Sequence, residues 1–157
     1  MPEERVSLQR TVAASPAAVF RILTDPTMHV EIDGSGMLLA APDTKRITAV
    51  GDTFDMNMDR EPLGDLPLGK YTVRNYVTKL TPDVLLEWTV GLLDQPPVGH
   101  LYGYVLEPVG DETSVTLYVD WTDARPEIKE AMTWPVVPVH MLEASMDNLV
   151  VIVSKNA

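Results

Sequence analysis

The chain has 157 residues, of which 45% are apolar and 22% are charged, and its formal net charge at pH 7 is -11. This length and composition indicate one globular domain (residues 1–157) with a sizeable core. The acidic balance argues against nucleic acid and anionic membrane surfaces as partners, and the lack of cysteine excludes disulfides and thiolate metal sites.

No stretch of the sequence approaches the roughly 20 apolar residues that a membrane span requires. The first ten residues (MPEERVSLQR) carry acids where a signal peptide has a basic region followed by an apolar run. We therefore expect a cytoplasmic protein, a monomer or a homodimer, with no nucleic-acid partner and no membrane span.

The first part of the chain predicts one strand followed by two short helices. Apolar and polar residues alternate over residues 5–12, as in a half-buried strand. Ser15 and Pro16 are typical of a helix start, because serine caps a helix and proline is tolerated in its first turn. Pro26 ends this helix, because the residue before a proline is disfavoured in the helical conformation. The expected helices span residues 17–23 and 27–32, and a glycine-containing turn (DGSG) follows at residues 33–36.

The middle of the chain predicts about six antiparallel strands. The clearest strand is residues 53–59, where Phe54, Met56 and Met58 alternate with polar residues. Turn signals such as Gly51-Asp52 separate the strands. The expected strands are residues 45–50, 53–59, 71–80, 84–91, 100–107 and 113–121, with a Pro/Gly-rich loop at 61–69 and a short helical approach at 126–134.

The last element is an amphipathic helix over residues 138–155, with Pro138 at its first position. Its apolar face needs a partner, and the amphipathic strands supply one apolar sheet face. We therefore predict an α+β fold: a curved antiparallel sheet of about seven strands wrapped on the long C-terminal helix. The two short helices would plug one end, leaving space between the sheet and the long helix. The predicted apolar face of the helix consists of Leu142, Ser145, Met146, Leu149, Ile152 and Val153, with Val151 as the one apolar residue on the opposite side.

In the order and spacing of these elements, the chain resembles the START-like (SRPBCC, helix-grip) superfamily, in its polyketide cyclase/dehydrase-like branch. The resemblance covers nearly the whole chain. It implies a hydrophobic cavity between sheet and long helix, which relatives use to bind lipids, hormones or polyketides and sometimes to catalyse aldol cyclisation or dehydration. It implies no shared set of catalytic residues. The motifs that carry it are residues 12–20 (VAASPAAVF), 25–26 (DP), 33–36 (DGSG), 77–82 (VTKLTP), 86–88 (LEW), 106–108 (LEP) and 113–116 (TSVT).

Large side chains at inward positions are the candidate lining of this cavity, with ordinary core packing as the alternative for each. Methionine adapts to varied shapes, and tyrosine and tryptophan add a polar group to an apolar body. Asn75 shares a strand face with Val73 and Val77, so it would place an amide inside. The expected ligand-binding residues are Met56, Met58, Asn75, Trp88, Tyr102, Tyr104, Trp121, Met141, Ser145 and Leu149.

His29, Asp33 and His100 are candidates for the mouth of the cavity. A histidine between the carboxylates of Glu31 and Asp33 could act as an acid or base, although acids at such a position also commonly cap helices or face solvent. The charged residues at 59–61 and 123–125 are expected to form solvated rims. The histidine spacing predicts no metal site, and no motif indicates a nucleophile or a cofactor.

The leading functional hypothesis is binding or transport of a small hydrophobic ligand, lipid or polyketide-like, in the internal cavity. The alternative is a polyketide cyclase or dehydratase. In that case His29 or His100 would be the base, and Tyr102, Tyr104 or Asn75 would hold the enolate oxygen. A third reading is an interaction protein whose acidic surface meets a basic partner. The sequence assigns no catalytic residue.

Overall fold

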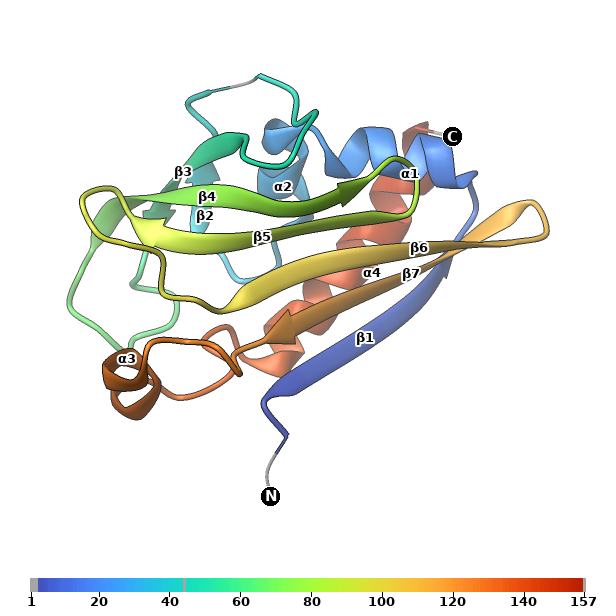
Figure 1. Ribbon diagram of the computed structural model, residues 1–157. Helices are drawn as coiled ribbons and strands as arrows, with labels where there is room; N and C mark the ends of the chain where they lie inside the picture. Colours follow the sequence, from blue (N-terminus) through green and yellow to red (C-terminus); the bar gives the residue numbers. More distant parts are fainter. Residues whose placement is uncertain (1–2, 44, 157) are drawn as a thin grey trace.

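The computed structural model describes residues 3–43 and 45–156. Seven strands form one antiparallel sheet in the order β1-β7-β6-β5-β4-β3-β2, and the long helix α4 crosses one face of it (Figure 1). This is the predicted α+β, helix-grip architecture. The strands are β1 (Arg5–Val12), β2 (Leu38–Ala40), β3 (Thr53–Asp59), β4 (Lys70–Thr81), β5 (Leu85–Leu92), β6 (Leu101–Val109) and β7 (Glu112–Asp120), and the helices are α1 (Pro16–Leu23), α2 (Pro26–Ile32), α3 (Pro126–Ala131) and α4 (Val139–Asn156).

Side-chain caps start both short helices, each one residue before its predicted start. The hydroxyl of Ser15 accepts a hydrogen bond from the amide of Ala18 at 3.2 Å, and the proline that follows it opens α1. The carboxylate of Asp25 accepts from the amide of Thr27 at 3.0 Å, and α2 begins directly after it at Pro26. Local sequence therefore decides where these helices begin.

Helix α4 buries the face that its periodicity predicts. Leu142, Met146, Leu149 and Val153 are buried, whereas Val151 on the opposite side is 52% exposed. The helix begins one residue later than expected, because the carbonyl of Pro138 caps it by accepting from the first-turn amides. Neither α4 nor any other helix in the described ranges combines the length and the apolar character needed to cross a membrane.

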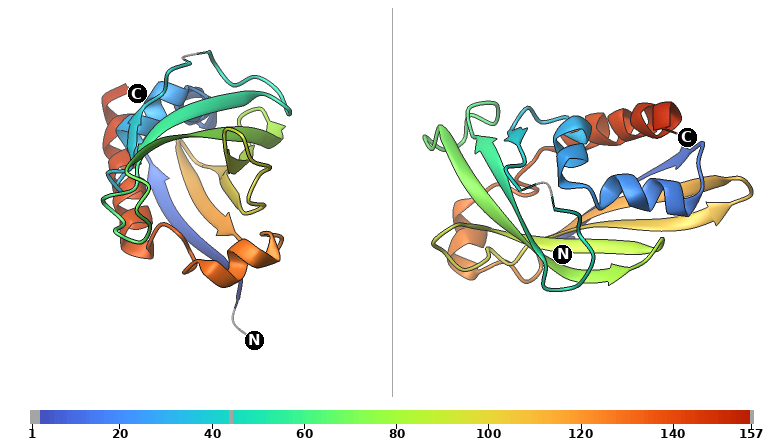
Figure 2. Two further views of the ribbon diagram at one scale, coloured as in Figure 1. Left: turned by 90° about the vertical axis from the view of Figure 1, so that its left-hand side faces the viewer. Right: turned by 90° about the horizontal axis from the view of Figure 1, so that it is seen from above.

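The sheet curves around α4 rather than lying flat against it (Figure 2). The helix packs on β1 at one edge of the sheet and on α1 and α2 at the other side. Gly34, in the loop after α2, approaches α4 so closely that a Cβ there would lie 2.6 Å from the Cβ of Ala144. The amide of Gly34 also donates to the hydroxyl of Ser145 at 2.7 Å. These contacts hold α4 against β1 and the two short helices and leave space between α4 and the middle strands of the sheet.

One predicted strand is wrong and one real strand was missed. Residues 45–50 form a loop, because the carboxylate of Asp52 accepts hydrogen bonds from the amides of Thr48 at 2.8 Å and Ala49 at 3.1 Å. The place beside β3 is taken by the three-residue strand β2, whose Leu38 pairs with Met58. A strand this short has no periodicity to detect.

A buried polar group ties the strands together on the sheet face turned away from α4. Glu87 is 4% exposed and accepts hydrogen bonds from Thr78 at 2.8 Å and from the hydroxyl of Tyr118. The ring of Tyr118 crosses Gly103 on the strand between them, and it reaches the carboxylate only because that residue has no side chain. Side chains of β4, β5 and β7 thus share one hydrogen-bond network.

Candidate functional site

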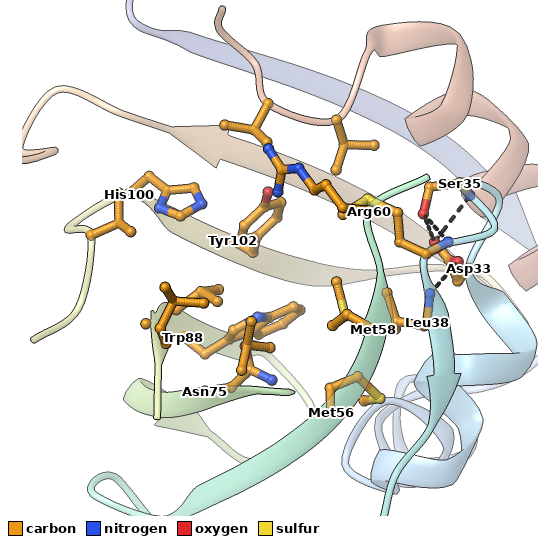
Figure 3. Close-up of a pocket in the computed structure, with 18 of the residues that line it drawn as sticks. Asp33, Ser35, Leu38, Met56, Met58, Arg60, Asn75, Trp88, His100 and Tyr102 are labelled. Carbon is orange, nitrogen blue, oxygen red and sulfur yellow. Dashed lines mark hydrogen bonds between the residues drawn. The ribbon is translucent and has the colours of Figure 1, made fainter. Parts of the chain in front are cut away.

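A cavity of about 490 Å³ lies between the sheet and α4 (Figure 3). Its walls are residues of β2 to β7 together with α2, the first half of α4, the loop at residues 61–69 and the segment at residues 127–137. Most lining side chains are apolar. Of the residues predicted from the sequence, Met56, Met58, Asn75, Trp88, Tyr102, Tyr104 and Ser145, together with His29, Asp33 and His100, line it.

Three residues predicted for the cavity do not line it. Trp121 is buried, but the ring of Trp134 stacks on it at 6.0 Å and takes the position facing the cavity. Leu149 is fully buried one turn beyond the cavity, in the core. Met141 is only half-buried, because the phase of α4 turns Leu142 toward the cavity in its place.

Aromatic rings form one wall of the cavity. The ring of Trp88 on β5 lies 5.9 Å from the rings of both Tyr102 and Tyr104 on β6, and 6.0 Å from that of Phe54 on β3. The pairing of β5 with β6 places Trp88 directly opposite Tyr102. Neighbouring strands therefore present these rings on the same face, as the alternation predicts.

His29 and Ser145 line the cavity, and each already makes a hydrogen bond to the backbone. The Nε2 atom of His29 lies 2.7 Å from the carbonyl of Leu23. Burial lowers the pKa of His29, against a smaller upward effect of that carbonyl and of Asp25. The hydroxyl of Ser145 accepts from Gly34 and donates to the carbonyl of Met141 at 3.2 Å. Both groups act mainly in holding the walls together.

Asp33 shapes the loop after α2. One of its carboxylate oxygens accepts from the amide of Ser35 at 3.0 Å and from the hydroxyl of Ser35 at 2.7 Å. The other accepts from the amide of Leu38 at 3.2 Å, as Figure 3 shows. Asp33 therefore caps the backbone after α2, which is one of the roles considered for it from the sequence. Glu31 is exposed and does not line the cavity.

His100 is the histidine whose polar atoms are not all accounted for. It is 6% exposed, and its ring lies edge-on between those of Tyr102 at 5.2 Å and Trp134 at 5.4 Å. Its Nδ1 atom is buried and has no hydrogen-bond partner among the described residues. Burial, with a smaller effect of the Arg60 charge, lowers the pKa of His100 to about 4. The imidazole is therefore neutral at pH 7.

Arg60 is the site residue that the sequence reasoning missed. We expected it in a solvated rim, but it is 7% exposed and lines the cavity. Its Nε and Nη2 atoms each donate to one oxygen of Asp65 at 2.7 Å, and Nη1 donates to the hydroxyl of Tyr71 at 3.2 Å. A signal was present, since Arg60 continues the inward alternation of Met56 and Met58.

The hydrogen bonds between Arg60 and Asp65 keep both side chains charged. Burial works against the charge of Arg60, but the hydrogen bonds to Asp65 and Tyr71 outweigh it and raise the pKa of Arg60. The same bond to Arg60 is the main cause that lowers the pKa of Asp65. Both groups are ionised at pH 7 and compensate each other.

The remaining polar groups of the cavity include neutral tyrosines, two acids and Asn75, whose amide donates to the carbonyl of Phe54 at 3.2 Å. Burial raises the pKa of Tyr102 and of Tyr104, so both hydroxyls stay protonated near pH 7. Asp33 and Glu127 are the acids among the lining residues. Within the described part of the chain, no three histidine or acidic side chains gather where they could hold a metal ion. The cavity thus offers hydrogen-bonding groups in an apolar enclosure.

Comparison with known proteins places the fold. No family model matches the chain. The chain is 34% identical over 118 residues to the uncharacterized protein Rv0088 of Mycobacterium tuberculosis, covering 74% of this chain and 47% of that protein. It therefore spans about half the length of the curated relatives it matches.

Solved structures resemble the chain over nearly its whole length. Protein Ms6760 from Mycobacterium smegmatis has a TM-score of 0.69 at 14% identity, covering 98% of this chain and 93% of its own. KanY has a TM-score of 0.64 at 16% identity, covering 98% and 99%. An AHSA1-like protein from Aeromonas hydrophila has a TM-score of 0.62 at 14% identity, covering 96% and 92%. These likenesses show a shared fold.

Proposed function

We propose that the protein binds a small hydrophobic ligand in the cavity between the sheet and α4. The observation that carries this proposal is the cavity itself: about 490 Å³, mostly apolar, with a few polar groups in its wall. Pockets for small molecules typically have volumes of about 300 to 1,000 Å³ and this kind of lining. The ligand would be lipid or polyketide-like in its apolar character.

The resemblance to the START-like superfamily supports the same proposal. Its members use the space between the sheet and the long helix for lipids, hormones or polyketides, and this chain has its cavity in that place. The helix-grip fold of the solved neighbours agrees with this reading at the level of the fold. We place the protein in the polyketide cyclase/dehydrase-like branch as part of the proposal.

The test is entry of a neutral apolar probe, N-phenyl-1-naphthylamine, followed by its emission and by quenching of tryptophan fluorescence from the cavity wall. Val90 lines the cavity on β5, so Val90→Trp should fill it and weaken probe binding at least about tenfold. Val84, just before the same strand, is 46% exposed, so Val84→Trp is the matched control and should bind like the wild type. Equal binding by both variants would place the probe elsewhere.

A second candidate function is cyclisation or dehydration of a polyketide-like substrate. The observation that favours it is the neutral imidazole of His100 beside the protonated hydroxyl of Tyr102 inside an apolar cavity. Such chemistry requires a base that removes a proton next to a carbonyl and a donor that holds the enolate oxygen. The lowered pKa of His100 makes it a weak base, which ranks this candidate second.

This candidate predicts a measurable proton transfer. In deuterated water, NMR should show faster deuterium exchange at the carbon between the carbonyls of a bound β-diketone, and His100→Gln should abolish the acceleration. Exchange at the uncatalysed rate in the wild type would leave ligand binding as the function.

A further inference from the structure

We infer that the cavity selects uncharged ligands that carry a hydrogen-bond acceptor, such as a ketone or ester carbonyl, and rejects free carboxylates. The acceptor would lie at the polar end of the cavity, which consists of Arg60, Tyr102 and His100 (Figure 3). This inference rests on the proposed ligand-binding function and adds the chemical class of the ligand.

Among the described residues that line the cavity, Arg60 is the only cation, and its charge is already compensated. Asp65 holds it through two parallel hydrogen bonds of 2.7 Å, the strongest geometry an arginine and a carboxylate can adopt. A ligand carboxylate would have to displace Asp65 or bind beside it at like charge. The Arg60–Asp65 pair therefore offers little net attraction to an anion.

The other charges of the cavity wall are negative. Asp33 and Glu127 line the cavity, and neither side chain would attract an anionic ligand. His100 is neutral at pH 7, so it adds no positive charge. Transfer of an ionised carboxylate from water into an enclosure without an unpaired cation is strongly unfavourable.

The polar end has spare hydrogen-bond donors on Arg60 and Tyr102. A guanidinium carries five N–H groups, and Asp65 and Tyr71 engage three of those of Arg60. The hydroxyl of Tyr102 is protonated, and no hydrogen bond to it is found within the described ranges. Donors left over in an apolar enclosure are best satisfied by a neutral acceptor on the ligand.

The experiment compares three ligands with one undecyl chain: 2-tridecanone, dodecanoic acid and undecylamine. Each displaces N-phenyl-1-naphthylamine from the wild-type protein at about pH 8, where dodecanoic acid is ionised. We expect the ketone to bind at least about tenfold more tightly than the carboxylate and the amine. Tighter binding of the carboxylate or of the amine would overturn the inference while leaving the proposed function intact. Failure of the probe to enter the cavity would overturn both.

Asp65→Asn tests the electrostatic cause. Removal of this carboxylate leaves the charge of Arg60 uncompensated, so dodecanoate should bind at least about tenfold more tightly than it does to the wild type. Asp59→Asn removes one negative charge near the same loop, from a carboxylate that accepts from the amide of Glu61 rather than from the guanidinium of Arg60, and it should leave the preference unchanged. An unchanged preference in Asp65→Asn, with the cavity still accepting the probe, would contradict the inference. Should Asp65→Asn fail to fold, the wild-type comparison decides by itself.

Discussion

Shortening a fully buried side chain of α4 tests whether the packing of this helix stabilises the fold. Leu149 is 0% exposed and lies in the core beyond the cavity, whereas Val151 on the same helix is 52% exposed. Leu149→Ala should therefore open a hole in close-packed surroundings and lower the free energy of unfolding by about 2–5 kcal/mol. Val151→Ala should change it by about 0.5 kcal/mol or less, because alanine's helix propensity offsets the small loss of contact.

Urea and thermal unfolding followed by circular dichroism measure both variants. For a domain of this size, 1 kcal/mol corresponds to roughly 2–4 °C, so a loss of about 3 kcal/mol should lower the Tm of Leu149→Ala by about 6–12 °C. The dependence of unfolding free energy on urea should stay the same, since the surface exposed on unfolding hardly changes. Equal midpoints for the two variants would refute the assigned face of α4 and the packing argument built on it.

Three further predictions concern buried polar groups. Gly103→Ala should lower the unfolding free energy by about 1–3 kcal/mol, measured by urea unfolding, because its Cβ would overlap the Tyr118 ring. Tyr118→Phe should cost about 1–3 kcal/mol in the same assay by leaving one oxygen of Glu87 unpaired, and adding Glu87→Leu should recover part of it. Between about pH 4 and pH 6.5 the unfolded chain binds a proton that folded His100 does not. Stability should therefore fall as the pH is lowered through this window, by up to about 3 kcal/mol, and His100→Gln should flatten that fall in melts at several pH values.

Much of the fold was readable from local sequence. The caps at Ser15 and Asp25 fixed the starts of α1 and α2, because a side-chain oxygen two or three residues from an amide needs no distant partner. The phase of α4 followed from the spacing of its apolar residues, and Leu149 and Val151 have the predicted burial and exposure. The same period-two alternation placed Trp88 and Tyr102 on one sheet face.

Local pattern failed where a contact from elsewhere in the chain competed with it. Residues 45–50 precede the hairpin signal Gly51-Asp52 and were predicted as a strand, yet the carboxylate of Asp52 and the carbonyl of Thr24 accept hydrogen bonds from their amides. Trp121 has the parity of an inward residue, but Trp134, from the segment before α4, covers it. Periodicity gives the face on which a side chain lies and is silent about what lies opposite it.

The sequence by itself determined the helix-grip arrangement, the apolar faces and some of the residues around the cavity, because these depend on short-range spacing. Only the tertiary structure decided the electrostatics of the cavity. Arg60 is buried because the loop at residues 61–69 folds back and brings Asp65 to its guanidinium. His100 is neutral because strands and the segment at 127–137 enclose it. Burial and pairing of a charge depend on which distant segments meet, and this information is carried by the folded chain as a whole.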